Sequence, residues 1–166
     1  MPSNDPMKFH YFKCINTLFS IIEDILDLDP SHVFYSGNAN DIPDYPYIAM
    51  NIPNPHHALQ HNSDFTDQVF TALINCNLYN AKDPEWPITA VSALKMELRD
   101  PVYRQKLIAC GATIDGVANP SSATSDIANA NDIYVANMQI HLMFHVYYHS
   151  SIPRIKFTNL NKYRRF

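Results

Sequence analysis

The stretch Tyr134-Val-Ala-Asn-Met-Gln-Ile-His-Leu-Met-Phe-His-Val-Tyr-Tyr148 decides the fold of this chain of 166 residues. Apolar residues take every second position: Tyr134, Ala136, Met138, Ile140, Leu142, Phe144, Val146 and Tyr148. The polar residues Asn137, Gln139, His141, His145 and His149 alternate with them on the other face. A period of two is that of a β-strand with one buried face. At about 3.4 Å per residue this strand spans about 50 Å, whereas most strands end within about ten residues.

A second long alternation predicts another over-long strand at about 66–80. Its apolar face holds Phe70, Ala72, Ile74, Cys76 and Leu78, and its polar face includes Asp67, Thr71, Asn75 and Asn77. Shorter strands are predicted at 32–36, 46–52 and 112–118, and the prolines of Ile52-Pro53-Asn54-Pro55 are expected to end the strand at 46–52. Both strands are longer than a domain of this size needs. Their length indicates a ribbon that extends beyond the core and packs against another protein, most simply a second copy of the chain.

Three helices complete the pattern. Apolar residues at three- and four-residue spacing predict an amphipathic helix over about 8–28. A second helix is predicted at 88–99, with an apolar face made of Val91, Leu94, Met96 and Leu98. A third begins with Asp100 as N-cap and Pro101 as first residue, and ends before Gly111. These elements predict an α+β domain, a mostly antiparallel sheet with the three helices packed on it.

The composition fits one globular domain and excludes several classes of protein. Hydrophobic residues make up 46% of the chain and charged residues 17%, which argues against disorder and against a coiled coil. The three glycines form no cluster, so the phosphate-binding loops of P-loop and Rossmann enzymes are excluded. Because no long apolar run or signal-peptide pattern occurs, we expect no membrane segment and maturation in the cytosol. The domain is expected at 8–150, between a flexible arm at 1–7 and an extension at 151–166.

Cysteine and histidine spacing does not favour disulfide or metal chemistry. Cys14, Cys76 and Cys110 are odd in number and far apart in sequence, and they are expected to be buried and reduced. His141, His145 and His149 stand about 13 Å apart along one face of a strand, too far for neighbours to share a zinc ion.

A second histidine group offers the alternative of a small metal-dependent hydrolase. His56, His57 and His61 are expected in a proline-bounded loop, without Cys, Asp or Glu at ligand spacing. The chain has no G-x-S-x-G or H-E-x-x-H motif, and no carboxylate pair within an apolar run. We therefore predict no catalytic residue, no metal ligand and no cofactor.

The end of the chain differs in charge from the rest. Its basic residues are Arg154, Lys156, Lys162, Arg164 and Arg165, and Phe157, Leu160, Tyr163 and Phe166 stand among them. The first 153 residues hold all sixteen acidic residues against seven Lys or Arg, a net charge of −9, and the whole chain carries −4. A basic tail on an acidic body predicts docking to an acidic surface, either a neighbouring protein or a phosphate backbone. The alternative is a solvated terminus.

Several segments resemble the phage neck or tail terminator family, small proteins that complete the head–tail junction of tailed bacteriophages. They are Phe12-Lys-Cys-Ile-Asn-Thr-Leu18, Ser36-Gly-Asn-Ala-Asn40, Tyr45-Pro-Tyr-Ile-Ala-Met-Asn-Ile52, Leu107-Ile-Ala-Cys-Gly-Ala-Thr-Ile114 and residues 127–148. Together they cover most of 8–150. The family's last strand usually carries charged residues on its polar face, where this chain has histidines. The extension after residue 150 has no counterpart in the resemblance.

The resemblance implies a non-enzymatic protein of the virion neck, assembled in the host cytoplasm. It implies a homo-oligomeric ring, commonly a hexamer, that joins a head-side connector or stopper protein to the tail tube, and to the sheath of a contractile tail. Such a ring ends tail polymerisation, and viral DNA passes through its lumen without sequence recognition. On this hypothesis the basic, aromatic extension docks to a partner, and the long strands close the ring through Asn75, Asn77, His141, His145 and His149. The alternative is a cytosolic adaptor or assembly chaperone that binds one partner as a monomer.

Overall fold

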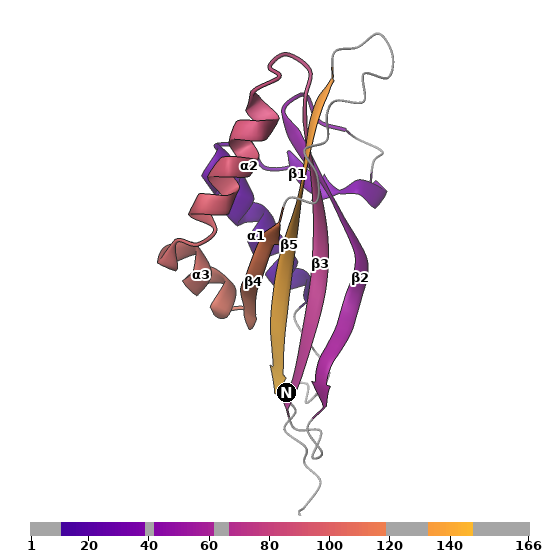
Figure 1. Ribbon diagram of the computed structural model, residues 1–166, viewed down its shortest axis with the longest axis vertical. Helices are drawn as coiled ribbons and strands as arrows, with labels where there is room; N and C mark the ends of the chain where they lie inside the picture. The colour runs from indigo at the N-terminus through magenta and orange to yellow at the C-terminus, as the bar shows by residue number, and fades with distance from the viewer. Residues whose placement is uncertain (1–10, 39–41, 62–66, 119–132, 148–166) are drawn as a thin grey trace, which may run out of the picture.

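The fold is that of a computed structural model, which describes residues 11–38, 42–61, 67–118 and 133–147. The expected arm at 1–7, the loop at 119–131, the extension at 151–166 and His149 lie outside the described residues. In chain order the elements are α1 (Tyr11–Leu26), β1 (Val33–Tyr35), the 3-10 turn η1 (Ser36–Asn38), β2 (Tyr47–His61), β3 (Asp67–Asn80), α2 (Trp86–Glu97), α3 (Pro101–Ile108), β4 (Ala112–Ala118) and β5 (Tyr134–Tyr147). The helices lie on one side of a single sheet (Figure 1).

The sheet has the strand order β1-β2-β3-β5-β4. The pairs β2·β3, β3·β5 and β4·β5 are antiparallel, and the three-residue β1 pairs parallel with β2. The predicted α+β class with a mostly antiparallel sheet is therefore confirmed. β3 and β5 stay paired from Asp67 opposite Tyr147 to Asn80 opposite Tyr134. The two strands that the alternation patterns predict are thus neighbours over their whole lengths.

β2 contradicts one prediction. Pro53 and Pro55 were expected to end this strand, but it continues through both of them to His61. Three long strands therefore form the ribbon, and not two. The prediction of a proline-bounded loop holding His56, His57 and His61 is also wrong, because all three belong to β2.

A shift in register explains how β2 accommodates the prolines. Asn51 faces Asn75 of β3, but Asn54 faces Leu73, so β2 advances by three residues while β3 advances by two. One extra residue on one strand is a β-bulge, and bulges are among the few places where a strand tolerates a residue without an N–H donor. Two further shifts follow before His61.

The helices bury the faces that their sequences predict, with two exceptions, Met96 and Phe12, which was expected in the apolar row of the first helix but is exposed. α1 turns a fully buried row toward the sheet: Cys14, Ile15, Leu18, Ile21 and Ile22. In and just after α2, Val91, Leu94 and Leu98 are buried, but Met96 is 70% exposed, so its predicted place on the apolar face is wrong. Met96 follows Leu94 by two positions, which is about 200° around a helix of 3.6 residues per turn.

The limits of α3 follow the predicted signals. Asp100 Oδ1 accepts a hydrogen bond from the backbone N–H of Val102 at 2.7 Å, and Pro101 takes the first helical position. Gly111, just past the end, has a φ of 88°, in the left-handed region that glycine adopts most easily. The N-cap and the glycine together fix the short path from α2 into β4.

The long strands extend past the helix layer. Pairing between β4 and β5 ends where Ala112 lies opposite Phe144, whereas β5 runs on to Tyr147 and remains paired with β3 there. Figure 1 shows β2, β3 and β5 continuing beyond β4 and α3 at the lower end of the molecule. This is the extended ribbon that the strand lengths predict.

Candidate functional site on the open sheet face

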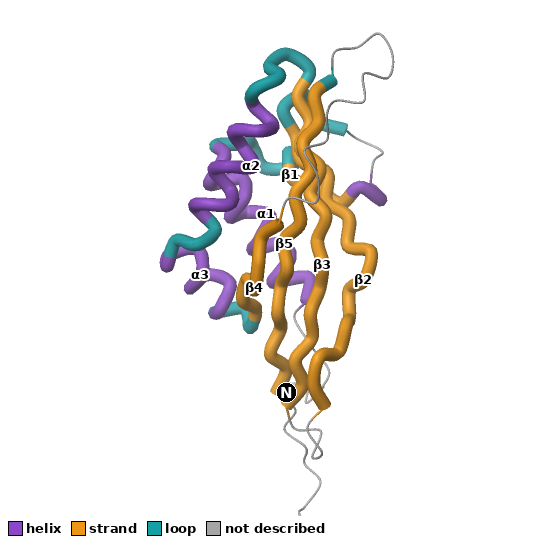
Figure 2. Tube along the Cα trace, viewed as in Figure 1, coloured by secondary structure: helices purple, strands orange, loops and turns teal. Residues whose placement is uncertain are grey.

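The face of the sheet opposite the helices carries the candidate site. Successive strand residues point to opposite faces, so the positions between the core residues of β2, β3 and β5 lie here. We define the open sheet face by Tyr47, Ala49, Asn51, Val69, Thr71, Leu73, Asn75, Asn77, Tyr79, Val135, Asn137, Gln139, His141 and Met143. None of these residues is Asp, Glu, Lys or Arg. The three α-helices α1, α2 and α3 lie on the other side of the sheet (Figure 2).

Five carboxamide side chains lie side by side on this face, across three strands. We call Asn51, Asn75, Asn77, Asn137 and Gln139 the carboxamide cluster; they line a hollow of about 230 Å³. Asn77 lies opposite Asn137, and Asn75 lies between Asn51 and Gln139. Gln139 Nε2 donates a hydrogen bond to Asn75 Oδ1 at 2.9 Å. Asparagine is unfavourable in strands, so its concentration at the middle of three strands is unusual.

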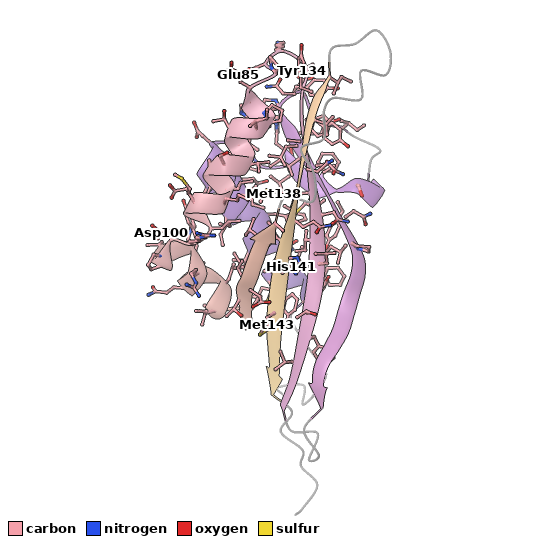
Figure 3. The ribbon with its side chains drawn as sticks, viewed as in Figure 1. Glu85, Asp100, Tyr134, Met138, His141 and Met143 are labelled. Atoms are coloured by element: carbon pink, nitrogen blue, oxygen red, sulfur yellow. The ribbon has the colours of Figure 1, made fainter. Side chains whose placement is uncertain are left out.

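The structure brings three of the predicted interface residues onto one surface. Asn75 and Asn77 belong to the carboxamide cluster, and the exposed His141 follows Gln139 by two positions on β5 (Figure 3). The backbone of His145 continues the same strand, but its side chain is outside the description, and so is the whole of His149.

An aromatic stack borders the carboxamide cluster, and sequence patterns did not reveal it. The ring centroid of Tyr47 lies 5.1 Å from that of Tyr45, 4.9 Å from that of Tyr79 and 5.7 Å from that of Phe34. Burial, reinforced by the neighbouring Tyr45 and Tyr79 phenols, raises the pKa of Tyr47 to about 12. The sequence places Tyr47 and Tyr79 near the ends of two predicted strands. Only the strand register shows that the two rings are in contact.

A second hollow lies where β1 ends. It has a volume of about 460 Å³ and is lined by Tyr11, Phe12, Tyr35, Ser36, Gly37, Met50, Asn51 and Ile52. Pairing of β1 with β2 stops at Tyr35 opposite Met50, so the rest of this β2 edge meets no strand among the described residues. Phe12 is 72% exposed. An exposed aromatic ring beside an open strand edge suits contact with another protein.

Comparison with known families decides what kind of protein carries these surfaces. A family model described as phage neck terminator protein matches residues 16–163. The chain belongs to this family. The resemblance inferred from short segments is thereby confirmed, and the match also includes most of the extension after residue 150, which that resemblance left unassigned. No curated protein matches the chain.

Membership of the phage neck terminator family assigns this chain a structural role in the virion, in contact with other virion proteins. Within the described ranges, no group of three or more His, Cys, Asp or Glu residues is placed to hold a metal ion. No helix in that part of the chain is long and apolar enough to cross a membrane. The chemistry that the open sheet face offers is hydrogen bonding by neutral donors and acceptors, beside stacked aromatic rings.

Proposed function

We propose that this neck terminator forms a closed ring of identical subunits, a hexamer, that joins the head connector to the tail tube and ends tail polymerisation. The observation that carries the proposal is the open sheet face, a wide surface on three long strands with no Asp, Glu, Lys or Arg among the residues that define it. A neighbouring subunit that covers this face buries the carboxamide cluster and His141. The ribbon beyond the helix layer gives each subunit the length to reach its neighbour.

The residue types on the open sheet face favour a protein over DNA as the contact. The cores of protein interfaces are poor in charged residues and rich in tyrosine. Surfaces that hold nucleic acid present Lys and Arg to the phosphates, and the open sheet face as defined has neither. The stack around Tyr47 and the neutral carboxamides therefore match a subunit contact. They provide hydrogen-bonding capacity without the cost of burying an unpaired charge.

A closed ring needs two different surfaces on each subunit, because a head-to-tail contact joins unlike patches. In this proposal the open sheet face is the first surface. The second is the hollow at the end of β1, with the exposed Phe12 in its wall. Both surfaces include Asn51, so the two contacts meet at β2.

The C-terminal extension is proposed as the contact to other neck and tail proteins. Its five basic residues and its aromatic residues suit an acidic protein surface on the head-side connector or stopper, the tail tube or the sheath. The rest of the chain carries a net charge of −9, which repels phosphates. Viral DNA therefore passes through the lumen without being retained or read.

Electron microscopy of the phage that encodes this chain tests the proposal. Particles assembled without the protein should show tails of uncontrolled length that are not joined to heads, and the full chain supplied in trans should restore them. A chain that ends at residue 150 should still form the ring but fail to join heads to tails. Tails of normal length joined to heads in the absence of the protein would refute the proposed function.

A further inference from the structure

Cys14 and Cys110 lie 96 positions apart in sequence but touch in the fold. The Cys14 thiol donates a hydrogen bond to the backbone carbonyl of Cys110 at 3.0 Å. Cys110 Sγ lies 3.2 Å from Thr17 Oγ1 of α1, and its thiol donates to the Lys106 carbonyl of α3 at 3.5 Å. Cys14 Sγ thus lies against the backbone of Cys110, and the Cys110 thiol is near enough to affect the pKa of the Cys14 thiol. Cys14 and Cys110 are neighbours in space, and the expectation that every cysteine is buried is wrong for Cys110, which is half-buried.

The two sulfur atoms differ in access to solvent. Cys14 is fully buried on the inner face of α1, whereas Cys110 is half-buried and therefore partly exposed to solvent. Burial, and next the adjacent Cys110 thiol, raise the pKa of Cys14 to about 11. Cys76, the third cysteine, is fully buried in β3. An accessible thiol backed by a buried one is the arrangement in which the first reacts with an oxidant and the second completes a disulfide.

We propose that Cys14 and Cys110 form a latent disulfide, open as the chain folds and closed by a small-molecule disulfide such as oxidised glutathione. The Cys110 thiol gives its proton to water, and its sulfur attacks one sulfur of the oxidant. A mixed disulfide forms at Cys110 and one glutathione thiolate leaves. Cys14 then loses its proton, its sulfur attacks the Cys110 sulfur, and the second glutathione leaves. The two cysteines are oxidised by two electrons, and one oxidised glutathione is reduced to two thiols.

The disulfide joins α1 to the junction of α3 and β4, across most of the chain. A bond that closes so long a loop removes many conformations from the unfolded state, so it stabilises the folded one. Thiols stay reduced in the cytosol, whereas disulfides persist on virions outside the cell. The bond thus leaves assembly unaffected and stiffens the helix layer after release. The inference does not depend on ring formation.

Thiol counting on the full chain tests the proposal. The protein is incubated with oxidised glutathione, denatured, alkylated and weighed by mass spectrometry. We expect one alkylated cysteine, Cys76, where the reduced chain shows three. Digestion with trypsin and a glutamate-specific protease cuts after Glu23, which separates Cys14 from Cys76, and should release a peptide that links Cys14 to Cys110. The midpoint of thermal unfolding should rise by roughly 5–15 °C on oxidation.

Single substitutions separate this disulfide from other products. Cys76→Ala should keep the link, and Cys14→Ser should stop at the mixed disulfide with glutathione on Cys110. Cys110→Ser changes a half-buried side chain and should fold, but it should form neither product. Three free thiols after oxidation of the wild type, a persistent glutathione adduct, or a link to Cys76 or between chains would each overturn the proposal.

Discussion

Replacing Asn77 by Asp places one negative charge in the middle of the open sheet face without changing the size of the side chain. Asn77 is half-buried on β3, opposite Ala49 of β2 and Asn137 of β5. In an isolated subunit this surface borders solvent, so the ionised carboxylate stays hydrated. The free energy of unfolding should therefore fall by no more than about 0.5 kcal/mol.

In the proposed ring the same carboxylate loses its water to the neighbouring subunit. No Lys or Arg stands among the residues that define the open sheet face, so the charge has no Lys or Arg partner among them. An unpaired charge buried in an interface costs about 2–4 kcal/mol. At about 1.4 kcal/mol per factor of ten, each subunit contact should weaken by about 30- to 700-fold. The variant should then be monomeric at concentrations where the wild type is assembled.

Light scattering on a size-exclusion column over a series of concentrations measures this effect, with circular dichroism to show that the variant is folded. Asn77→Ser removes the carboxamide without adding charge and should retain assembly. Ser92→Asp adds the same charge at an exposed position of α2 and should assemble like the wild type. Normal assembly of Asn77→Asp, with loss of assembly in Ser92→Asp, would show that the neighbour covers the helix layer instead.

Three further predictions concern the subunit itself. Phe144→Ala removes a fully buried ring whose centroid lies 5.4 Å from that of Tyr11, and urea denaturation should show a loss of about 3–5 kcal/mol. Asp100→Ala removes the acceptor for the Val102 N–H and should cost about 1 kcal/mol, most of which Asp100→Asn should restore. Burial raises the pKa of Tyr11 and of Tyr47 from 10.0 to about 12, so the folded chain holds these protons more tightly than the unfolded chain. The resulting stabilisation is complete below pH 10 and is lost as the pH rises through 12; urea titrations at increasing pH should show this loss, and Tyr47→Phe should reduce it.

Residue spacing in the sequence predicts the strands and helix ends of this fold that depend only on neighbouring residues. The alternation at 134–148 and at 66–80 gives β5 and β3, because a strand with one buried face repeats every two residues. The limits of β4 at Ala112 and Ala118 agree with the prediction, and so does the start of α3, where Asp100 supplies its own hydrogen bond. Because side chains alternate between the two faces of a strand, the same period of two places Asn75, Asn77 and His141 on one face.

The remaining features depend on contacts between distant segments. Proline in the interior of a strand normally ends it, so the sequence predicts that the strand stops at Pro53. β2 continues because a bulge opposite β3 accommodates the extra residue. The stack of Tyr47 on Tyr79 and the contact of Cys14 with Cys110 likewise need the pairing register and the packing of α1. A single sequence carries no periodic signal for such contacts.

The native mass of the purified full chain tests ring formation most directly. Sedimentation equilibrium on protein with all three thiols reduced should show one species of about six subunits of 19.0 kDa each. The Asn77→Asp variant should shift toward 19.0 kDa. Ring formation would be contradicted if the wild-type chain were monomeric at every concentration and stayed monomeric when tail tubes that lack this protein were added.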